Sequence, residues 1–147
     1  MGQIRILHVE DDLGVQNIFC NKLKGLPVAI TSVTTVSEAL NLIRQGEAIF
    51  NNENLARIKA NPAFDIVVSD VDLADTVQPA HIWETRQDGY EVARQGVMLE
   101  IPHVVIASVT DTPSKRVEGA PMYDKSNGFE QVLSLVKTLV DGGGKIA

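Results

Sequence analysis

A chain of 147 residues with 44% hydrophobic and 22% charged residues has the size and composition of one globular domain. Its net charge of −6, without a basic run, argues against direct nucleic-acid binding, and no segment is long and apolar enough for membrane insertion. The single cysteine, Cys20, excludes an internal disulfide and fits a reducing, cytoplasmic compartment.

Strand and helix patterns alternate along the chain. Short apolar runs rich in β-branched residues predict buried parallel strands. The five predicted strands are Ile4–Val9, Val28–Val33, Phe64–Ser69, His103–Ala107 and Pro121–Asp124.

Helical spacing of apolar residues predicts the intervening helices. They cover Leu13–Leu23, a segment N-capped by Ser37, a short piece at Glu53–Ala60, Gly89–Gln95 and Phe129–Val140. The alternation predicts an α/β fold, a doubly wound parallel sheet with helices on both faces. We expect one domain over residues 1–141 and a flexible tail over 142–147.

Polar side chains follow three of the predicted strands. The first strand runs into Glu10 and Asp11, the third into Asp70, and the fourth into Ser108. Ligands of open α/β sheets sit outside the carboxyl ends of the strands. A metal-dependent phosphoryl site at this edge is therefore the leading hypothesis.

Five short motifs follow one another in the chain: Ile6–Asp12, Asp65–Asp70, Asp88–Glu91, Ile106–Ser108 and Gly119–Lys125. In this order they resemble the receiver domain of two-component response regulators, of the single-domain chemotaxis type, over about residues 3–140. The resemblance implies a five-stranded parallel sheet of flavodoxin-like order 2-1-3-4-5.

The resemblance also implies a reaction. Asp70 would be the phosphoacceptor, and Ser108 and Lys125 would contact phosphoryl oxygens. The donor would be a histidine kinase or a phosphotransfer protein, and phosphorylation would switch a surface that binds a downstream protein. The chain would then phosphorylate itself rather than act as a multiple-turnover enzyme.

A divalent cation would offset the repulsion between a carboxylate and an incoming phosphoryl group. Mg²⁺ or Mn²⁺ fits, because these ions take oxygen ligands. The expected protein ligands are Glu10, Asp11, Asp70 and the backbone carbonyl of Asp72.

The segment around Lys125 departs from the family pattern. Ser126 follows the lysine where the family usually has proline, which leaves the geometry of the Lys125–Ser126 peptide, cis or trans, open. Met122 stands three residues before the lysine, where an aromatic is usual, and Tyr123 comes one residue later.

Two further departures concern spacing. The position of Pro102 allows either Ser108 or Ala107 to occupy the switch position at the end of strand four. Residues 46–62 and 75–87 form stretches that are longer than the family norm.

Other interpretations of the same residues remain open. The run Glu10–Asp12 could cap the following helix. Asp70 and Asp72 imitate the nucleophile and acid of a haloacid-dehalogenase-type phosphatase. A pseudo-receiver, a binding module that is never phosphorylated, is the third possibility. His8 and His103 lack metal-ligand spacing and are expected to be hydrogen-bonded structural residues.

Overall fold

The computed structural model describes residues 3–51, 62–71, 89–108, 117–126 and 129–142. Within this part of the chain, five parallel strands form one sheet in the order β2-β1-β3-β4-β5. This order confirms the prediction. The strands are β1 (Ile4–Val9), β2 (Val28–Val33), β3 (Ile66–Ser69), β4 (His103–Ser108) and β5 (Met122–Asp124).

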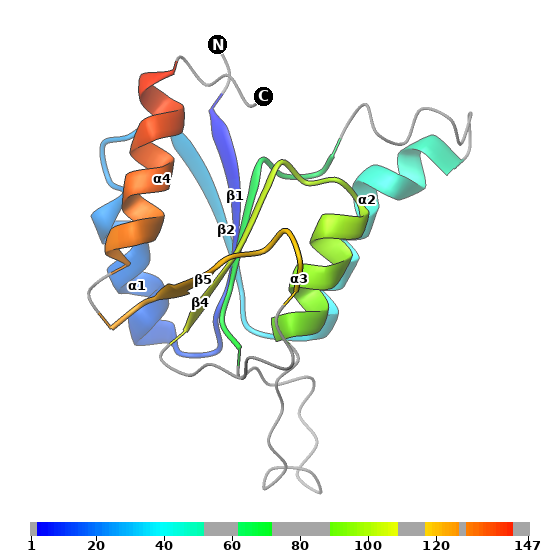
Figure 1. The fold of residues 1–147 in the computed structure, drawn as a ribbon, viewed down its shortest axis with the longest axis horizontal. Helices are drawn as coiled ribbons and strands as arrows, with labels where there is room; N and C mark the ends of the chain where they lie inside the picture. The colour runs from blue at the N-terminus through cyan, green and yellow to red at the C-terminus, as the bar shows by residue number, and fades with distance from the viewer. Residues whose placement is uncertain (1–2, 52–61, 72–88, 109–116, 127–128, 143–147) are drawn as a thin grey trace, which may run out of the picture.

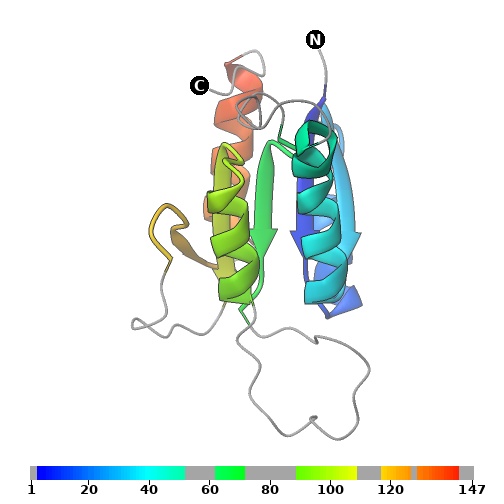
Figure 2. The same cartoon turned by 90° about the vertical axis from the view of Figure 1, so that its right-hand side faces the viewer.

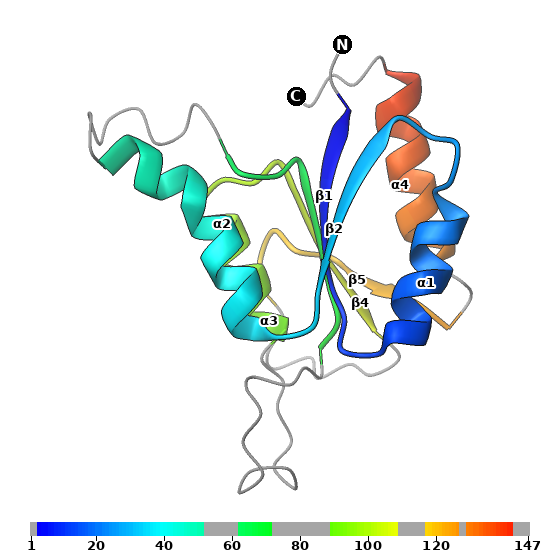
Figure 3. The same ribbon diagram turned by 180° about the vertical axis from the view of Figure 1, so that it is seen from behind.

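Helices cover both faces of the sheet, as the alternating pattern predicted. In Figures 1 and 3, α1 and α4 lie together on one face, and α2 and α3 lie together on the other. The helices are α1 (Leu13–Lys22), α2 (Val36–Asn51), α3 (Gly89–Met98) and α4 (Glu130–Asp141). None of the helices in the described ranges is long and apolar enough to cross a bilayer.

The strand boundaries agree closely with the prediction. The limits of β1 and β2 are those expected, whereas β3 begins at Ile66 rather than Phe64. Phe64 is buried in the core, but the β1–β3 ladder starts where Ile66 pairs with Ile6. The apolar residue Phe64 therefore indicated the core correctly, but it did not indicate where strand pairing begins.

The expected N-cap of the second helix was wrong by two residues. The Thr35 hydroxyl, not that of Ser37, accepts the Glu38 N–H at 3.2 Å. The Glu38 carboxylate in turn accepts the Thr34 N–H at 3.3 Å, and that bond, followed by the Thr35 hydroxyl, lowers the pKa of Glu38. This arrangement is a variant of the capping box in which the carboxylate accepts the N–H of the residue before the cap. The short helix expected at Glu53–Ala60 lies outside the described residues.

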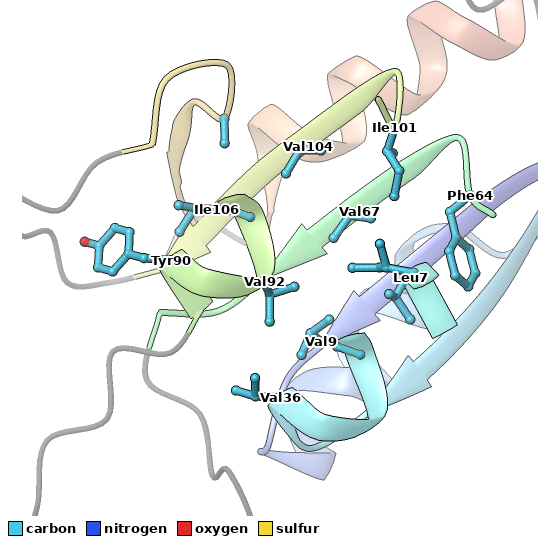
Figure 4. Packing of buried hydrophobic residues seen from close by; sticks show 14 of the residues in the cluster. Leu7, Val9, Val36, Phe64, Val67, Tyr90, Val92, Ile101, Val104 and Ile106 are labelled. Atoms are coloured by element: carbon cyan, nitrogen blue, oxygen red, sulfur yellow. The ribbon is translucent and has the colours of Figure 1, made fainter. Parts of the chain in front are cut away.

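Two apolar clusters hold the sheet between its helices. Figure 4 shows the cluster under α2 and α3, where Leu7, Val67 and Val92 lie between sheet and helices. The second cluster, which we call the α1/α4 core, packs on the opposite face. Its buried members include Ile6, Phe19, Val68, Val105, Ala107, Phe129, Val132 and Val136.

All five strands run in the same direction, so their carboxyl ends meet at one edge. This is the lower edge in Figure 2, toward which the strand arrowheads point. The residues after β1, β3 and β5 therefore become neighbours although they are far apart in the sequence.

Candidate functional site

Three carboxylates meet at the carboxyl edge of the sheet. Glu10 and Asp11 follow β1 and Asp70 follows β3, and one oxygen of each lies within 4.8 Å of the others. Glu10 and Asp70 are buried, with 2% and 8% of their surface exposed, whereas Asp11 is exposed. Like charges at this separation repel strongly where little water screens them.

Lys125 is the cation that balances part of this charge. Its Nζ lies 2.7 Å from Glu10 Oε1 and 3.2 Å from Asp70 Oδ1. Its backbone N–H donates to the Ser108 carbonyl at 3.3 Å, which fixes the start of the side chain at the end of β4. The ammonium thus bridges two of the three carboxylates from the end of β5, the edge strand.

Burial and charge shift the pKa values of these groups. Burial raises the pKa of Glu10 to about 7, because it outweighs the Lys125 hydrogen bond that favours the charged form. The pKa of Asp11 is also raised, first by burial and then by the Asp70 charge. For Lys125, burial opposes the charge, but the Glu10 hydrogen bond and Asp70 together raise its pKa. The site therefore favours added positive charge.

Asp12 has a different role from the two acids before it. Its Oδ1 accepts the N–H groups of Gly14 at 2.8 Å and Val15 at 3.2 Å, so it is the N-cap of α1. The capping interpretation is therefore confirmed for Asp12. Glu10 Oε2 accepts the Asp12 N–H at 3.2 Å, which links the cap to the acidic cluster.

Hydrogen bonds fix Asp70 on several sides. Its N–H donates to the Val9 carbonyl at 2.9 Å, and its own Oδ1 accepts the Val71 N–H at 2.8 Å. The buried Ser69 hydroxyl donates to the Asp70 carbonyl at 2.9 Å. The carboxylate is consequently held in one orientation before any ligand arrives.

Strand register favours Ala107 over Ser108 as the neighbour of Asp70. The β3–β4 ladder pairs Ser69 with Ile106, so Asp70 comes alongside Ala107. Ala107 packs in the α1/α4 core, and because side chains alternate along a strand, Ser108 points to the opposite face. Ser108 is buried at the end of β4.

The departures around Lys125 have structural counterparts. Met122 packs against the cluster under α2 and α3, whereas Tyr123 packs against the α1/α4 core. Tyr123 therefore packs on the opposite face of the sheet from Met122, the residue three positions before the lysine. No cis peptide occurs in the described ranges, so the Lys125–Ser126 bond is trans.

His8 is buried among aromatic rings, and one of its two ring nitrogens lacks the hydrogen bond that was expected. Its ring centroid lies 4.1 Å from that of Phe19 and 5.7 Å from that of Phe129. Its Nδ1 has no hydrogen-bond partner among the described residues. Burial, aided by the Lys125 charge, lowers the pKa of His8 to about 3. At His103, burial also lowers the pKa, and Asp65 partly opposes that shift.

Several predicted features fall outside the described residues. They include the Asp72 carbonyl proposed as a metal ligand, most of the 46–62 stretch and the whole of the 75–87 stretch. For these the sequence-based expectations stay predictions.

Solved structures similar to this chain are receiver domains of two-component proteins. The receiver domain of the histidine kinase CKI1 from Arabidopsis thaliana, complexed with Mg²⁺ and BeF₃⁻, has a TM-score of 0.63 and 20% identity. That match covers 94% of this chain and 90% of that one. The chain has the receiver-domain fold.

Two further receiver structures match at similar levels. A receiver protein from Sinorhizobium medicae has a TM-score of 0.61 and 19% identity, covering 95% of each chain. The phosphorylated cyanobacterial phytochrome response regulator RcpA has a TM-score of 0.57 and 20% identity, covering 94% of this chain and 91% of that one. No family model and no curated protein matches the sequence.

Within the receiver-domain fold, the acidic cluster lies where the strand order reverses. β1 leads to β2 on one side and pairs with β3 on the other, so Glu10 and Asp70 flank this reversal. Crevices at such points are the usual ligand sites of doubly wound sheets. Carboxylate oxygens are hard donors, so the residues present fit Mg²⁺ or Mn²⁺.

Proposed function

We propose that this chain is a phosphoacceptor of a two-component system and that Asp70 receives the phosphoryl group. One observation supports this most strongly: Asp70 lies in a cluster with Glu10 and Asp11 and also contacts Lys125, at the ligand-binding edge of a receiver fold. A nucleophile, a hard-cation site and a fixed positive charge are the parts that phosphoryl transfer to a carboxylate requires.

In the proposed reaction, an Asp70 oxygen attacks the phosphorus of a phosphohistidine on the partner protein. The new O–P bond forms as the P–N bond breaks, and its electron pair returns to the donor imidazole. Lys125 Nζ, 3.2 Å from Asp70 Oδ1, is placed to pair with a phosphoryl oxygen. The chain's contribution is positioning and charge stabilisation.

Glu10, Asp11 and Asp70 would hold Mg²⁺ or Mn²⁺, with the Asp72 carbonyl as the further proposed ligand. When bound, the ion offsets the repulsion between the attacking carboxylate and the phosphoryl oxygens. Waters complete the shell of such ions, so we expect weak affinity.

Treatment with acetyl phosphate and Mg²⁺, followed by intact-mass analysis, tests the proposal. We expect one phosphoryl adduct on the wild-type chain and none on Asp70→Asn, whose amide is nearly isosteric but a poor nucleophile. Multiple turnover would instead identify a phosphatase that uses Asp70 and Asp72, and no adduct would identify a pseudo-receiver. An adduct on Asp70→Asn would assign the nucleophile elsewhere.

The proposed output is a change of surface that a cytoplasmic downstream protein recognises after transfer from a histidine kinase or phosphotransfer protein. Lys125, which contacts Asp70, is the proposed donor to the phosphoryl group, and Ser108 is the second donor expected from the sequence, against the register that places Ala107 beside Asp70. Amide hydrogen exchange with and without beryllofluoride and Mg²⁺ should change over residues 108–126. If Ser108→Ala leaves that change intact, the register with Ala107 beside Asp70 is the correct one.

A further inference from the structure

The first residue of α3 packs directly on the backbone of Asp70. A Cβ atom added to Gly89 would lie 1.7 Å from the Asp70 carbonyl oxygen and 2.7 Å from its carbonyl carbon. It would also lie 2.8 Å from the Val71 Cα. All three atoms belong to the backbone, so no side-chain rotation relieves the overlap.

Backbone conformation does not explain the glycine. The glycines with positive φ in the described ranges are Gly25, at 92°, and Gly119, at 89°. Gly89 is the first residue of α3 and has no positive φ, so its backbone conformation is one that alanine also adopts. The close approach to Asp70 is therefore the physical reason why a side chain is excluded at this position.

The contacts around Gly89 lead directly to the carboxylate of Asp70. The Gly89 N–H donates to the Val71 carbonyl at 3.0 Å, and the Val71 N–H donates to Asp70 Oδ1 at 2.8 Å. Ser69 holds the Asp70 carbonyl through its hydroxyl. The peptide between Asp70 and Val71 is thus fixed by Gly89 and Ser69, and this peptide orients the carboxylate.

We propose that Gly89 is a positioning residue for the phosphoacceptor. Its missing side chain lets α3 hold the Asp70–Val71 peptide, and hence Oδ1, in the orientation that faces Lys125 and the acidic cluster. This inference rests on the proposed function, because it assigns a role toward the same carboxylate.

A side chain at Gly89 would displace this peptide. Real Cβ atoms essentially never approach another heavy atom within 3.0 Å, so the 1.7 Å separation requires a backbone shift of more than 1 Å. A displacement of about 1 Å at a reacting group can cost roughly 100-fold in rate.

Gly89→Ala tests the proposal, with Gly96→Ala as the matched control in the same helix. At Gly96 the added Cβ would meet Val104 Cγ2 at 3.1 Å, a side-chain atom that can move. Mn²⁺ affinity by electron paramagnetic resonance, adduct formation with acetyl phosphate, and urea unfolding should be measured on both. We expect Gly89→Ala to bind Mn²⁺ at least about tenfold more weakly and to react roughly 100-fold more slowly. Gly96→Ala should stay within about twofold of wild type in both Mn²⁺ affinity and reaction rate.

Unfolding data separate positioning from a purely structural role. If Gly89→Ala is less stable but keeps wild-type Mn²⁺ affinity and reactivity, the proposal is overturned. Ser69→Ala adds no bulk and releases the same carbonyl, so it decides the question if Gly89→Ala does not fold. A several-fold loss of reactivity in Ser69→Ala would support the inference, and wild-type behaviour would refute it. If the wild-type chain itself neither binds Mn²⁺ nor reacts, the proposed function fails instead.

Discussion

Charged side chains are arranged differently at the two ends of the sheet. At the amino edge, Asp65 accepts the Arg5 N–H at 2.8 Å and lies 3.1 Å from the Arg5 guanidinium, so one acid meets one base. At the carboxyl edge, Glu10, Asp11 and Asp70 lie together, and Lys125 bridges two of them. An excess of carboxylates costs stability in the metal-free chain, and it is also what a cation site requires.

The sharpest test of this difference is the loss of a single carboxylate at each end. Asp11→Asn should weaken Mn²⁺ binding by more than about tenfold, since it removes one of few protein ligands. Asp65→Asn removes an acid that already has a cation partner and should leave the affinity unchanged. Titration with Mn²⁺, monitored by electron paramagnetic resonance, measures the affinity of both variants. Equal loss in the two variants, or no loss in Asp11→Asn, would contradict the placement of the site.

The pH dependence of stability should distinguish the environments of His8 and His103. The folded pKa of His8, about 3, lies below its ordinary value of 6.5, so stability present above pH 6.5 is lost as the pH falls. By linkage, His8 accounts for about 2 kcal/mol of the stability lost between pH 8 and pH 5. In His8→Leu, the free energy of unfolding measured in urea should therefore fall less between pH 8 and pH 5 than it does in the wild type, by this amount.

The control for this comparison is His103→Gln at the amino edge. His103 is half-buried, and Asp65 opposes the lowering of its pKa. Its substitution should therefore change the pH dependence less than His8→Leu does. A larger effect at His103 would show that the aromatic surroundings of His8 do not hold it neutral.

Glu10 should contribute a pH dependence of the opposite sign. Its folded pKa of about 7 lies above the ordinary 4.5, so its contribution is fully present below pH 4.5 and lost as the pH rises through 7. In metal-free buffer at pH 8, Glu10→Gln should be more stable than wild type by something on the order of 1 kcal/mol. Glu38→Gln, which removes the capping carboxylate, should be less stable at the same pH. A Glu10→Gln variant that is less stable than wild type would show that its pairing with Lys125 outweighs its burial.

The smallest effect is expected at the amino edge. Arg5 is 45% exposed at its side chain, so Arg5→Gln should cost about 0.5 kcal/mol in urea unfolding. Phosphoryl uptake should be unchanged. A loss of uptake would mean that the two edges are coupled through β1.

The strands and the acids that follow them were accessible from the sequence because their signals are local, whereas the strand order came from the family resemblance. An apolar, β-branched run that ends in a carboxylate specifies both a strand and the residue at its carboxyl end. The N-cap of α2 was missed because Thr35 and Ser37 are both good caps within two residues of each other. The helix continues through Gly46 to Asn51, since a single glycine costs only about 1 kcal/mol.

The finer geometry depends on contacts between distant segments and has no local signal. Glu10 and Lys125 are 115 positions apart, and their pairing follows from the sheet order. A choice between Ala107 and Ser108 needs the strand register, because a slip of one residue reverses the face on which a side chain lies. The contacts of His8 with Phe19 of α1 and Phe129 at the start of α4 likewise depend on tertiary packing.

The hydrogen bond from the Gly89 N–H to the Val71 carbonyl has a consequence for tolerance to insertions. It joins the two ends of residues 72–88 next to Asp70, so the number of residues between them need not alter the position of either end. Doubling such a connection costs only about 0.6 kcal/mol of chain entropy. The number of residues between Val71 and Gly89 should therefore change at little cost in folding free energy, while the two flanking residues keep their places beside Asp70.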